Sequence, residues 1–261
     1  MYFAITKQLS RLALVVLASL AAACVTTTET VFTEKASPEK ALERRVELAR
    51  NYVGEGDWEN AKRNLKLAYE IDPDNAEVHE AFALVYQSTG EFEMAEESFK
   101  TAIRLDKNFS RARNNYAAFL YSQERYDEAE KQLEFVVQDT LYEGRPRAFV
   151  NLGLCRRQLF DSQGAEEAFL RALSMDRTNR IALLEVAEIR FDAGDLENAG
   201  RYYDTYRTVA RRQSARGLWL GVRIARETGD RDAEGSYALA LSNMYPDSAE
   251  YQSYKRLADG E

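Results

Sequence analysis

Residues 90–108 read GEFEMAEESFKTAIRLDKN, and they follow NAEVHEAFALVYQST at residues 75–89. Small and large apolar residues recur through both stretches in a fixed order: Phe82, Ala83, Tyr86, Gly90, Ala95, Phe99 and Ala102. This spacing is typical of two amphipathic helices joined by a short turn at Gly90. We therefore expect a helical pair whose small residues lie where the two helices cross.

The same pattern recurs along the chain. The alanine at the start of the second helix returns at steps of 34, 34, 36, 34 and 34 residues: Ala61, Ala95, Ala129, Ala165, Ala199 and Ala233. The two additional residues fall in the loop that contains Gly144 and Pro146, which mark a break between helices. The pattern resembles the tetratricopeptide repeat. The resemblance implies an all-α fold, a right-handed solenoid of six helix-turn-helix repeats with a C-terminal capping helix.

The repeats predict where the solenoid lies in the chain. Residues 38–261 are expected to form it, with repeats at about 42–75, 76–109, 110–145, 146–179, 180–213 and 214–246 and a cap at 247–258. Small residues should meet at each crossing, as Gly153 with Ala165. Large residues, such as Leu48, Tyr52 and Leu65 in the first repeat, should fill the gap to the next one. One pair cannot bury them alone, so stability must come from stacked neighbours.

The C-terminal end has two features of its own. Three glycines, Gly217, Gly221 and Gly235, each cost up to about 1 kcal/mol in a helix and predict that the sixth repeat is the least stable. Beyond it, Tyr251 and Tyr254 belong to an apolar stripe with polar residues outside, as a terminal capping helix requires.

The N-terminus resembles a bacterial lipoprotein signal. Residues 1–23 carry Lys7 and Arg11, then an apolar stretch at 12–20 and the small residues Ala21-Ala22-Ala23, which together predict a signal peptide. Cys24 would then become the first mature residue and carry the lipid. Leucine is expected where Ala21 stands, and Ala-Ala-Ala could equally be cut by the ordinary signal peptidase, which would leave a periplasmic protein without a lipid.

Residues 24–37 predict a lipidated N-terminus and a flexible tether. The segment VTTTETVFTEKA at 25–36 is rich in threonine and has no helical period. By resemblance to lipoproteins that are sorted outward, Val25 after Cys24 predicts the outer membrane of a Gram-negative cell, with the protein lipid-anchored on the periplasmic face. Several acyl chains give a stable anchor, because each buried methylene contributes about 0.8 kcal/mol.

Composition and charge narrow the possible ligands. The chain has 261 residues, of which 45% are hydrophobic and 30% are charged. Together with the repeats, this composition predicts one continuous solenoid with a core along its length. Its formal net charge is −8, and it becomes −10 once the segment with Lys7 and Arg11 is removed. That charge disfavours nucleic acid or an anionic membrane surface as the principal partner.

No pattern in the sequence indicates catalysis. There is no GxGxxG, P-loop or GxSxG motif. His79 is the single histidine and has no partners at ligand spacing, so a structural role is favoured over a metal site. Cys155, on a helix within the stack, reads as a small buried hydrophobe and not as a reactive thiol. We expect no enzyme activity, no metal, no cofactor and no small-molecule substrate.

Three motifs carry a more specific resemblance: RNNYAAFL at 113–120, ERYDEA at 124–129 and NLGLC at 151–155. They look like the central motifs of the type IV pilus biogenesis lipoproteins of the PilF/PilW kind, called pilotins. The resemblance implies an adaptor that binds the type IV pilus secretin and promotes its outer-membrane localisation and multimerisation. Pilus biogenesis and twitching motility would depend on it indirectly.

Pattern and composition alone establish only an exported helical-repeat binding protein. One alternative is another lipoprotein scaffold of the same architecture, serving outer-membrane barrel assembly or cell-wall hydrolases. A second alternative is an enzyme-associated or substrate-modifying role.

The candidate protein-binding residues lie on the first helices of the third and fourth repeats: Arg111, Asn114, Asn115, Tyr121, Arg147 and Asn151. In the repeat register Asn115 and Asn151 occupy the same position on what should be the concave face. Two amides at repeat spacing could hold the backbone of an extended peptide while arginines meet its carboxylates. The alternative is that the asparagines brace neighbouring turns. The equivalent positions of the first two repeats do not complete a carboxylate clamp.

Overall fold

The computed structural model describes residues 37–259, all of whose regular elements are helices. The helices are α2 (Pro38–Glu55), α3 (Trp58–Ile71), α4 (Ala76–Thr89), α5 (Phe92–Leu105), α6 (Ser110–Ser122), α7 (Tyr126–Val136), α8 (Arg145–Gln158), α9 (Ser162–Met175), α10 (Arg180–Asp192), α11 (Leu196–Val209), α12 (Ala215–Glu227), α13 (Arg231–Met244) and α14 (Ala249–Asp259). The predicted signal peptide, the tether up to residue 36 and the lipidation site Cys24 lie outside the described residues.

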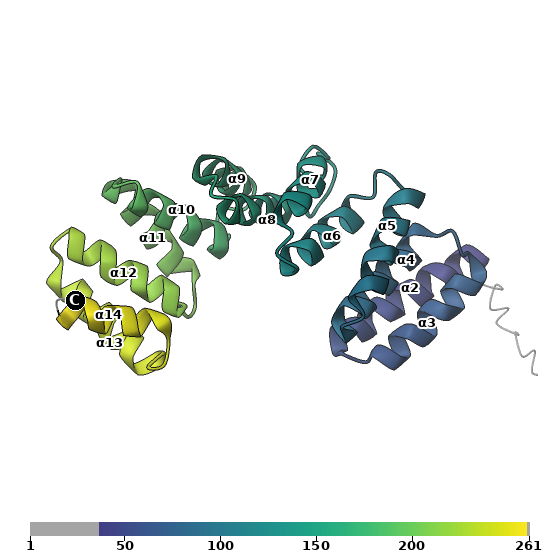
Figure 1. Ribbon diagram of the computed structural model, residues 1–261, viewed down its shortest axis with the longest axis horizontal. Coiled ribbons are helices and arrows are strands. Elements are labelled where there is room, and N and C mark those ends of the chain that lie inside the picture. The colour runs from purple at the N-terminus through teal and green to yellow at the C-terminus, as the bar shows by residue number, and fades with distance from the viewer. Residues whose placement is uncertain (1–36, 260–261) are drawn as a thin grey trace, which may run out of the picture.

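The helices pack as six pairs that follow one another along an arch, and α14 is left as a single helix at the end (Figure 1). Each helix contacts only its own pair or a neighbouring one. The helices α6 and α8 lie on the inner side of the arch, whereas α7 and α9 lie on the outer side. The prediction of an all-α solenoid of six repeats with a final capping helix is confirmed.

The two helices of a pair approach closely where the small residues meet. Ala83 and Ala95 are both fully buried. A Cβ built on Gly153 would lie 2.5 Å from the ring of Phe169, so this crossing admits glycine only. The sixth pair is looser, because Ala233 is only half-buried.

One expected packing residue is not part of the core. Leu48 was predicted to fill the gap to the next repeat, but its side chain is 43% exposed and that prediction is wrong. The buried face of α2 is instead formed by Leu42, Val46 and Ala49, which are spaced by three or four residues and so lie on one side of the helix. Leu48 is adjacent to Ala49 in sequence and therefore points in a different direction. Tyr52 packs against the same cluster from a partly buried position.

Turn chemistry explains where the helices begin and end. Ser37 caps α2, its Oγ accepting from the backbone N–H of Lys40 at 3.3 Å. The turns within pairs need one residue in the left-handed region, which is Gly90 at φ 82° in the second pair. The equivalent residues of the third and fourth pairs are Glu124 at φ 59° and Phe160 at φ 62°, and neither has the freedom of glycine.

The core runs along the whole arch as three adjoining clusters. Its largest fully buried side chains include an aromatic or leucine from most second helices, such as Leu65, Phe99, Leu133 and Phe169. The terminal helix α14 contacts α12 and α13 but has no buried residue of its own. Burial is therefore continuous between repeats and decreases at the C-terminal end.

Candidate functional site

The candidate residues belong to α6 and α8, which lie on the inner side of the arch (Figure 1). Asn115 on α6 and Asn151 on α8 occupy equivalent positions in adjacent repeats. Arg111 and Arg147 lie one helical turn before them, on the same helix face. The structure thus brings the predicted ladder together on one surface.

A buried carboxylate holds the third repeat to the first two. Glu80 on α4 is fully buried, and its Oε1 accepts from Asn115 Nδ2 at 2.7 Å. Its Oε2 accepts from Arg50 Nη2, on α2, at 2.8 Å. Arg111 makes weaker ion pairs here, 3.3 Å from Glu77 Oε2 and 3.8 Å from Glu80 Oε2. Three consecutive repeats therefore meet at one acidic centre, which we call the Glu80 cluster.

The fourth repeat is joined to the third by neutral hydrogen bonds. Asn151 Nδ2 donates to Oδ1 of Asn114 at 3.2 Å, and Asn114 is itself buried. The hydroxyl of Tyr121 accepts from Gln158 Nε2 at 3.3 Å. These contacts brace neighbouring repeats, yet each of the ladder's two amides retains an oxygen with no hydrogen bond among the described residues. Either oxygen is free to accept from a ligand.

Arg147 differs from the other candidate residues. Its side chain is exposed, and within residues 37–259 it forms no ion pair or side-chain hydrogen bond. A guanidinium in this state can meet a carboxylate without first breaking an internal contact. Arg147 is therefore the cation on this ladder that is ready for a ligand, whereas Arg111 is already engaged with acids.

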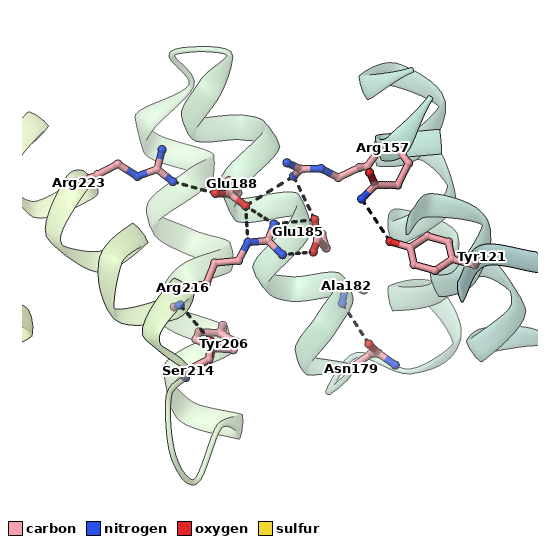
Figure 2. A network of polar contacts seen from close by, with 12 residues as sticks. Tyr121, Arg157, Asn179, Ala182, Glu185, Glu188, Tyr206, Ser214, Arg216 and Arg223 are labelled. Carbon is pink, nitrogen blue, oxygen red and sulfur yellow. Dashed lines mark hydrogen bonds and ion pairs between the residues drawn. The ribbon is translucent and has the colours of Figure 1, made fainter. Parts of the chain in front are cut away.

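A second ion cluster, missed by the sequence reasoning, joins α8, α10 and α12 in the C-terminal half of the chain (Figure 2). Glu185 and Glu188 on α10 lie between Arg157 from α8 and two arginines of α12. Arg157 Nη1 is 3.0 Å from Glu185 Oε2. Arg216 donates to both carboxylates, and Arg223 Nη2 donates to Glu188 Oε1 at 2.9 Å. The repeat register contains the signal for it, because Glu185 stands where Asn115 and Asn151 stand earlier.

In each cluster, neighbouring arginines lower the pKa of one carboxyl group, Glu77 in the first and Glu188 in the second. Burial raises the pKa of Glu188, but the attraction of Arg216 outweighs it and holds that pKa below its usual value. Burial lowers the pKa of Arg216, yet its hydrogen bond to Glu185 leaves the guanidinium pKa above the ordinary value. At Glu77 burial again raises the pKa, and the positive charge of Arg111 overcomes it. The clusters therefore tie neighbouring repeats together as charge pairs.

Two further residues lie in packed surroundings. Cys155 is buried beside a cavity of about 80 Å³ that Tyr121 also lines, and burial raises the pKa of its thiol to about 12. The thiol is consequently protonated at neutral pH and a poor nucleophile. His79 is half-buried, with Nε2 2.9 Å from the carbonyl oxygen of Pro73 and its ring edge-on to Tyr69.

In the described part of the chain, no group of three His, Cys, Asp or Glu residues is placed to hold a metal ion. None of the helices between residues 37 and 259 is long and apolar enough to cross a membrane. What the inner face presents is hydrogen-bonding groups, charge and shape, which are the means of non-covalent recognition.

Comparison with known proteins identifies relatives along most of the chain. The tetratricopeptide repeat family matches residues 80–134, 120–176 and 150–215. The type IV pilus assembly protein PilF of Pseudomonas aeruginosa is 38% identical over 217 residues, which are 83% of this chain and 86% of that protein. The solved structure of P. aeruginosa PilF covers 84% of this chain and 98% of its own, with a TM-score of 0.80 and 38% identity. PilW, described as a widely conserved type IV pilus biogenesis factor, has a TM-score of 0.72 and 26% identity over 82% of this chain and 98% of its own.

Proposed function

Because the chain is a tetratricopeptide-repeat protein and belongs to the family of the type IV pilus proteins PilF and PilW, we propose that it acts as a pilotin. In this role it is an outer-membrane-anchored, periplasm-facing adaptor that binds the type IV pilus secretin and promotes its localisation and multimerisation. Pilus biogenesis and twitching motility follow from that step, and the proposal includes no catalysis. The observation that carries it is the match to PilF over most of both chains.

The proposal assigns a role to each part of the chain. Residues 1–23 are removed as a signal peptide, Cys24 receives the lipid, and residues 24–37 tether the solenoid to the membrane. Residues 38–261 form the repeat domain that meets the partner. The h-region and the Ala23-Cys24 junction support this division.

The inner face is the proposed secretin-binding surface. An extended segment of the partner can donate backbone N–H groups to the two free amide oxygens of Asn115 and Asn151. A carboxylate of the same segment can meet the exposed guanidinium of Arg147. Tyr121 adds an aromatic surface beside the ladder.

Titration of the secretin's soluble periplasmic domains tests this surface. Arg147→Ala is the cleanest variant, because Arg147 is exposed and has no ion pair or side-chain hydrogen bond within residues 37–259 to lose. It should weaken binding roughly tenfold, whereas Arg177→Ala, another exposed and unpaired cation, should leave affinity unchanged. Asn115→Ala with Asn151→Ala should weaken binding further. Equal affinities for all variants would place the partner on another surface.

The biological role and the anchor are tested in cells. Deleting the gene should abolish heat-stable secretin multimers in the outer membrane. Intact multimers alongside a defect in outer-membrane barrels or cell-wall cleavage would instead favour another envelope scaffold. Cys24→Ser should release a folded protein from the membrane and mislocalise the secretin, and retention of palmitate label by that variant would contradict lipidation at Cys24.

A further inference from the structure

Three equivalent grooves lie between successive repeats, each formed by the second helix of one repeat and both helices of the next. The first is lined by Tyr69, His79, Phe82, Tyr86, Glu93, Met94, Glu97 and Ser98 and has a volume of about 510 Å³. The second is lined by residues of α5, α6 and α7 and by Lys107 just after α5, and it measures about 590 Å³. The third measures about 420 Å³ and is lined by residues of α7, α8 and α9 and by Val137 and Gln138 just after α7.

The second groove, which we call the cationic groove, has a charge that its neighbours lack. Arg104, Lys107 and Lys131 line it, and its one acidic lining residue, Glu128, is paired with Arg125 at 2.7 Å. The register equivalents of these three residues in the first repeat pair are Glu70, Pro73 and Glu97, and in the next pair they are Gln138, Leu141 and Glu167. Three positive charges thus stand together at one repeat where the equivalents on both sides are acidic or neutral. The chain as a whole has a net charge of −8, so this concentration opposes its average.

Within the described residues, no side chain of the protein pairs with these three cations. Among residues 37–259, the side chains of Arg104, Lys107 and Lys131 form no ion pair and no hydrogen bond, and all three are exposed. The other cations of the groove are occupied. Lys100 pairs with Glu96 at 2.8 Å, and Arg113 donates to the carbonyl oxygen of Lys107 and to Gln132. Charge in the cationic groove is therefore available to an external anion.

The floor of the cationic groove is apolar. It is formed by Ile103, Tyr116 and Leu120 beneath the charged rim. Tyr116 and Leu120 are buried, and the hydroxyl of Tyr116 donates to Glu96 at 2.9 Å, so half-buried Ile103 supplies the apolar surface that a ligand can reach. A ligand that fits both features has carboxylates beside one large apolar side chain.

We infer that the cationic groove is a docking site for an acidic segment of a partner protein that carries one large apolar side chain. A protein segment suits the site better than an anionic lipid surface, because the groove is concave and Glu97 and Glu134 lie on either side of its cations. Those carboxylates repel an extended anionic surface but spare a single narrow strand. The cationic groove shares no lining residue with the Asn115–Asn151 ladder, so it stands independently of whether the inner face binds a secretin.

A defined peptide tests the inference on the full chain. The probe is a fluorescently labelled peptide of Asp and Glu with one central Phe, and its binding is followed by anisotropy. R104E/K107E/K131E should weaken binding at least tenfold. The matched control R177E/R180E/R201E reverses three other exposed, unpaired cations by the same total charge and should change affinity less than twofold. Replacing the peptide's Phe with Ser should also weaken binding to the wild type.

Several results would overturn the inference. These are equal losses in the two triple variants, equal binding of a Lys-for-Glu peptide, or undiminished peptide binding by R104E/K107E/K131E. Loss of binding to phosphatidylglycerol vesicles in that variant, with peptide binding unchanged, would assign the groove to lipid. Circular dichroism checks folding, and K131Q alone, which removes one exposed charge, should show a smaller loss in the same direction if the triple variant unfolds.

Discussion

The Glu80 cluster gives the sharpest test of how the repeats are held together. Glu80→Gln preserves the size of the side chain and removes its charge. The carboxylate is fully buried and accepts from Arg50 at 2.8 Å and from Asn115 at 2.7 Å. Hydrogen bonds to a charged group contribute about 1.5–3 kcal/mol each. Because the Arg50 side chain is 28% exposed, its share is discounted, and we expect a total loss of about 2 kcal/mol.

A double-mutant cycle isolates the contact that matters for the candidate site. Asn115→Ala alone should cost about 1.5–3 kcal/mol, because it leaves the buried, charged Glu80 Oε1 without its partner. Combined with Glu80→Gln it should cost less than the sum, since Glu80→Gln already reduces the same contact to a hydrogen bond without charge. Asn151→Ala, whose amide bonds Asn114 instead, is the control and should add to Glu80→Gln within about 0.5 kcal/mol.

Hydrogen exchange of the α4 amides is the appropriate assay, because a solenoid opens locally and has no single global transition. Protection in α4 should fall in Glu80→Gln by the amount stated, with little change in α12. Strict additivity of Asn115→Ala and Glu80→Gln would refute the reasoning, because it would mean that the 2.7 Å contact contributes nothing and that Asn115 is held by other forces.

Three other predictions follow from local geometry. Phe160→Gly should raise the melting midpoint, since φ at 62° costs a non-glycine residue about 1 kcal/mol, and a lower midpoint would show that the exposed ring packs. Gly221→Ala should lower stability by about 1–3 kcal/mol, because its Cβ would lie 2.1 Å from a buried tyrosine hydroxyl. Gly235→Ala, whose Cβ would have nothing within 4 Å, should raise stability by up to about 1 kcal/mol in the same thermal assay. Equal effects of the two substitutions would contradict the packing argument. Hydrogen bonding from Arg125 lowers the pKa of Glu96 from 4.5 to about 2. The stability that the Glu96 carboxylate contributes is therefore complete above pH 4.5 and is lost as the pH falls to about 2. An acid-unfolding curve of Glu96→Gln that superimposes on that of the wild type would disprove this.

The fold was readable from the sequence because one physical constraint repeats. Two helices can cross closely only over small side chains, so Ala83, Ala95 and their equivalents had to return at the repeat length. The structure buries both of them. The prediction failed for a large residue, whose position the close helix crossing does not constrain: Leu48 shares a helix with buried residues but points to solvent. The glycines of the sixth repeat also have a packing role that the sequence did not reveal, since Gly217 and Gly221 leave space for tyrosine rings.

The candidate site was only partly predictable. Register alone places Asn115 and Asn151 on one face, because equivalent positions of a repeat share a surface. Which amide atom remains free depends on Glu80 and Asn114, and no local pattern reveals those partners. The same limit hid the Glu185 cluster, because its arginines come from repeats on both sides.

Contacts that reach only the neighbouring repeat have a kinetic consequence. Side-chain hydrogen bonds among residues 37–259 join groups at most 37 positions apart. Chains with such low contact order pay little loop-closure entropy before native contacts form, and they fold on the microsecond to millisecond scale. The first repeats can therefore assemble while later ones are still being synthesised, and the arch can grow from its N-terminal end without waiting for residue 259.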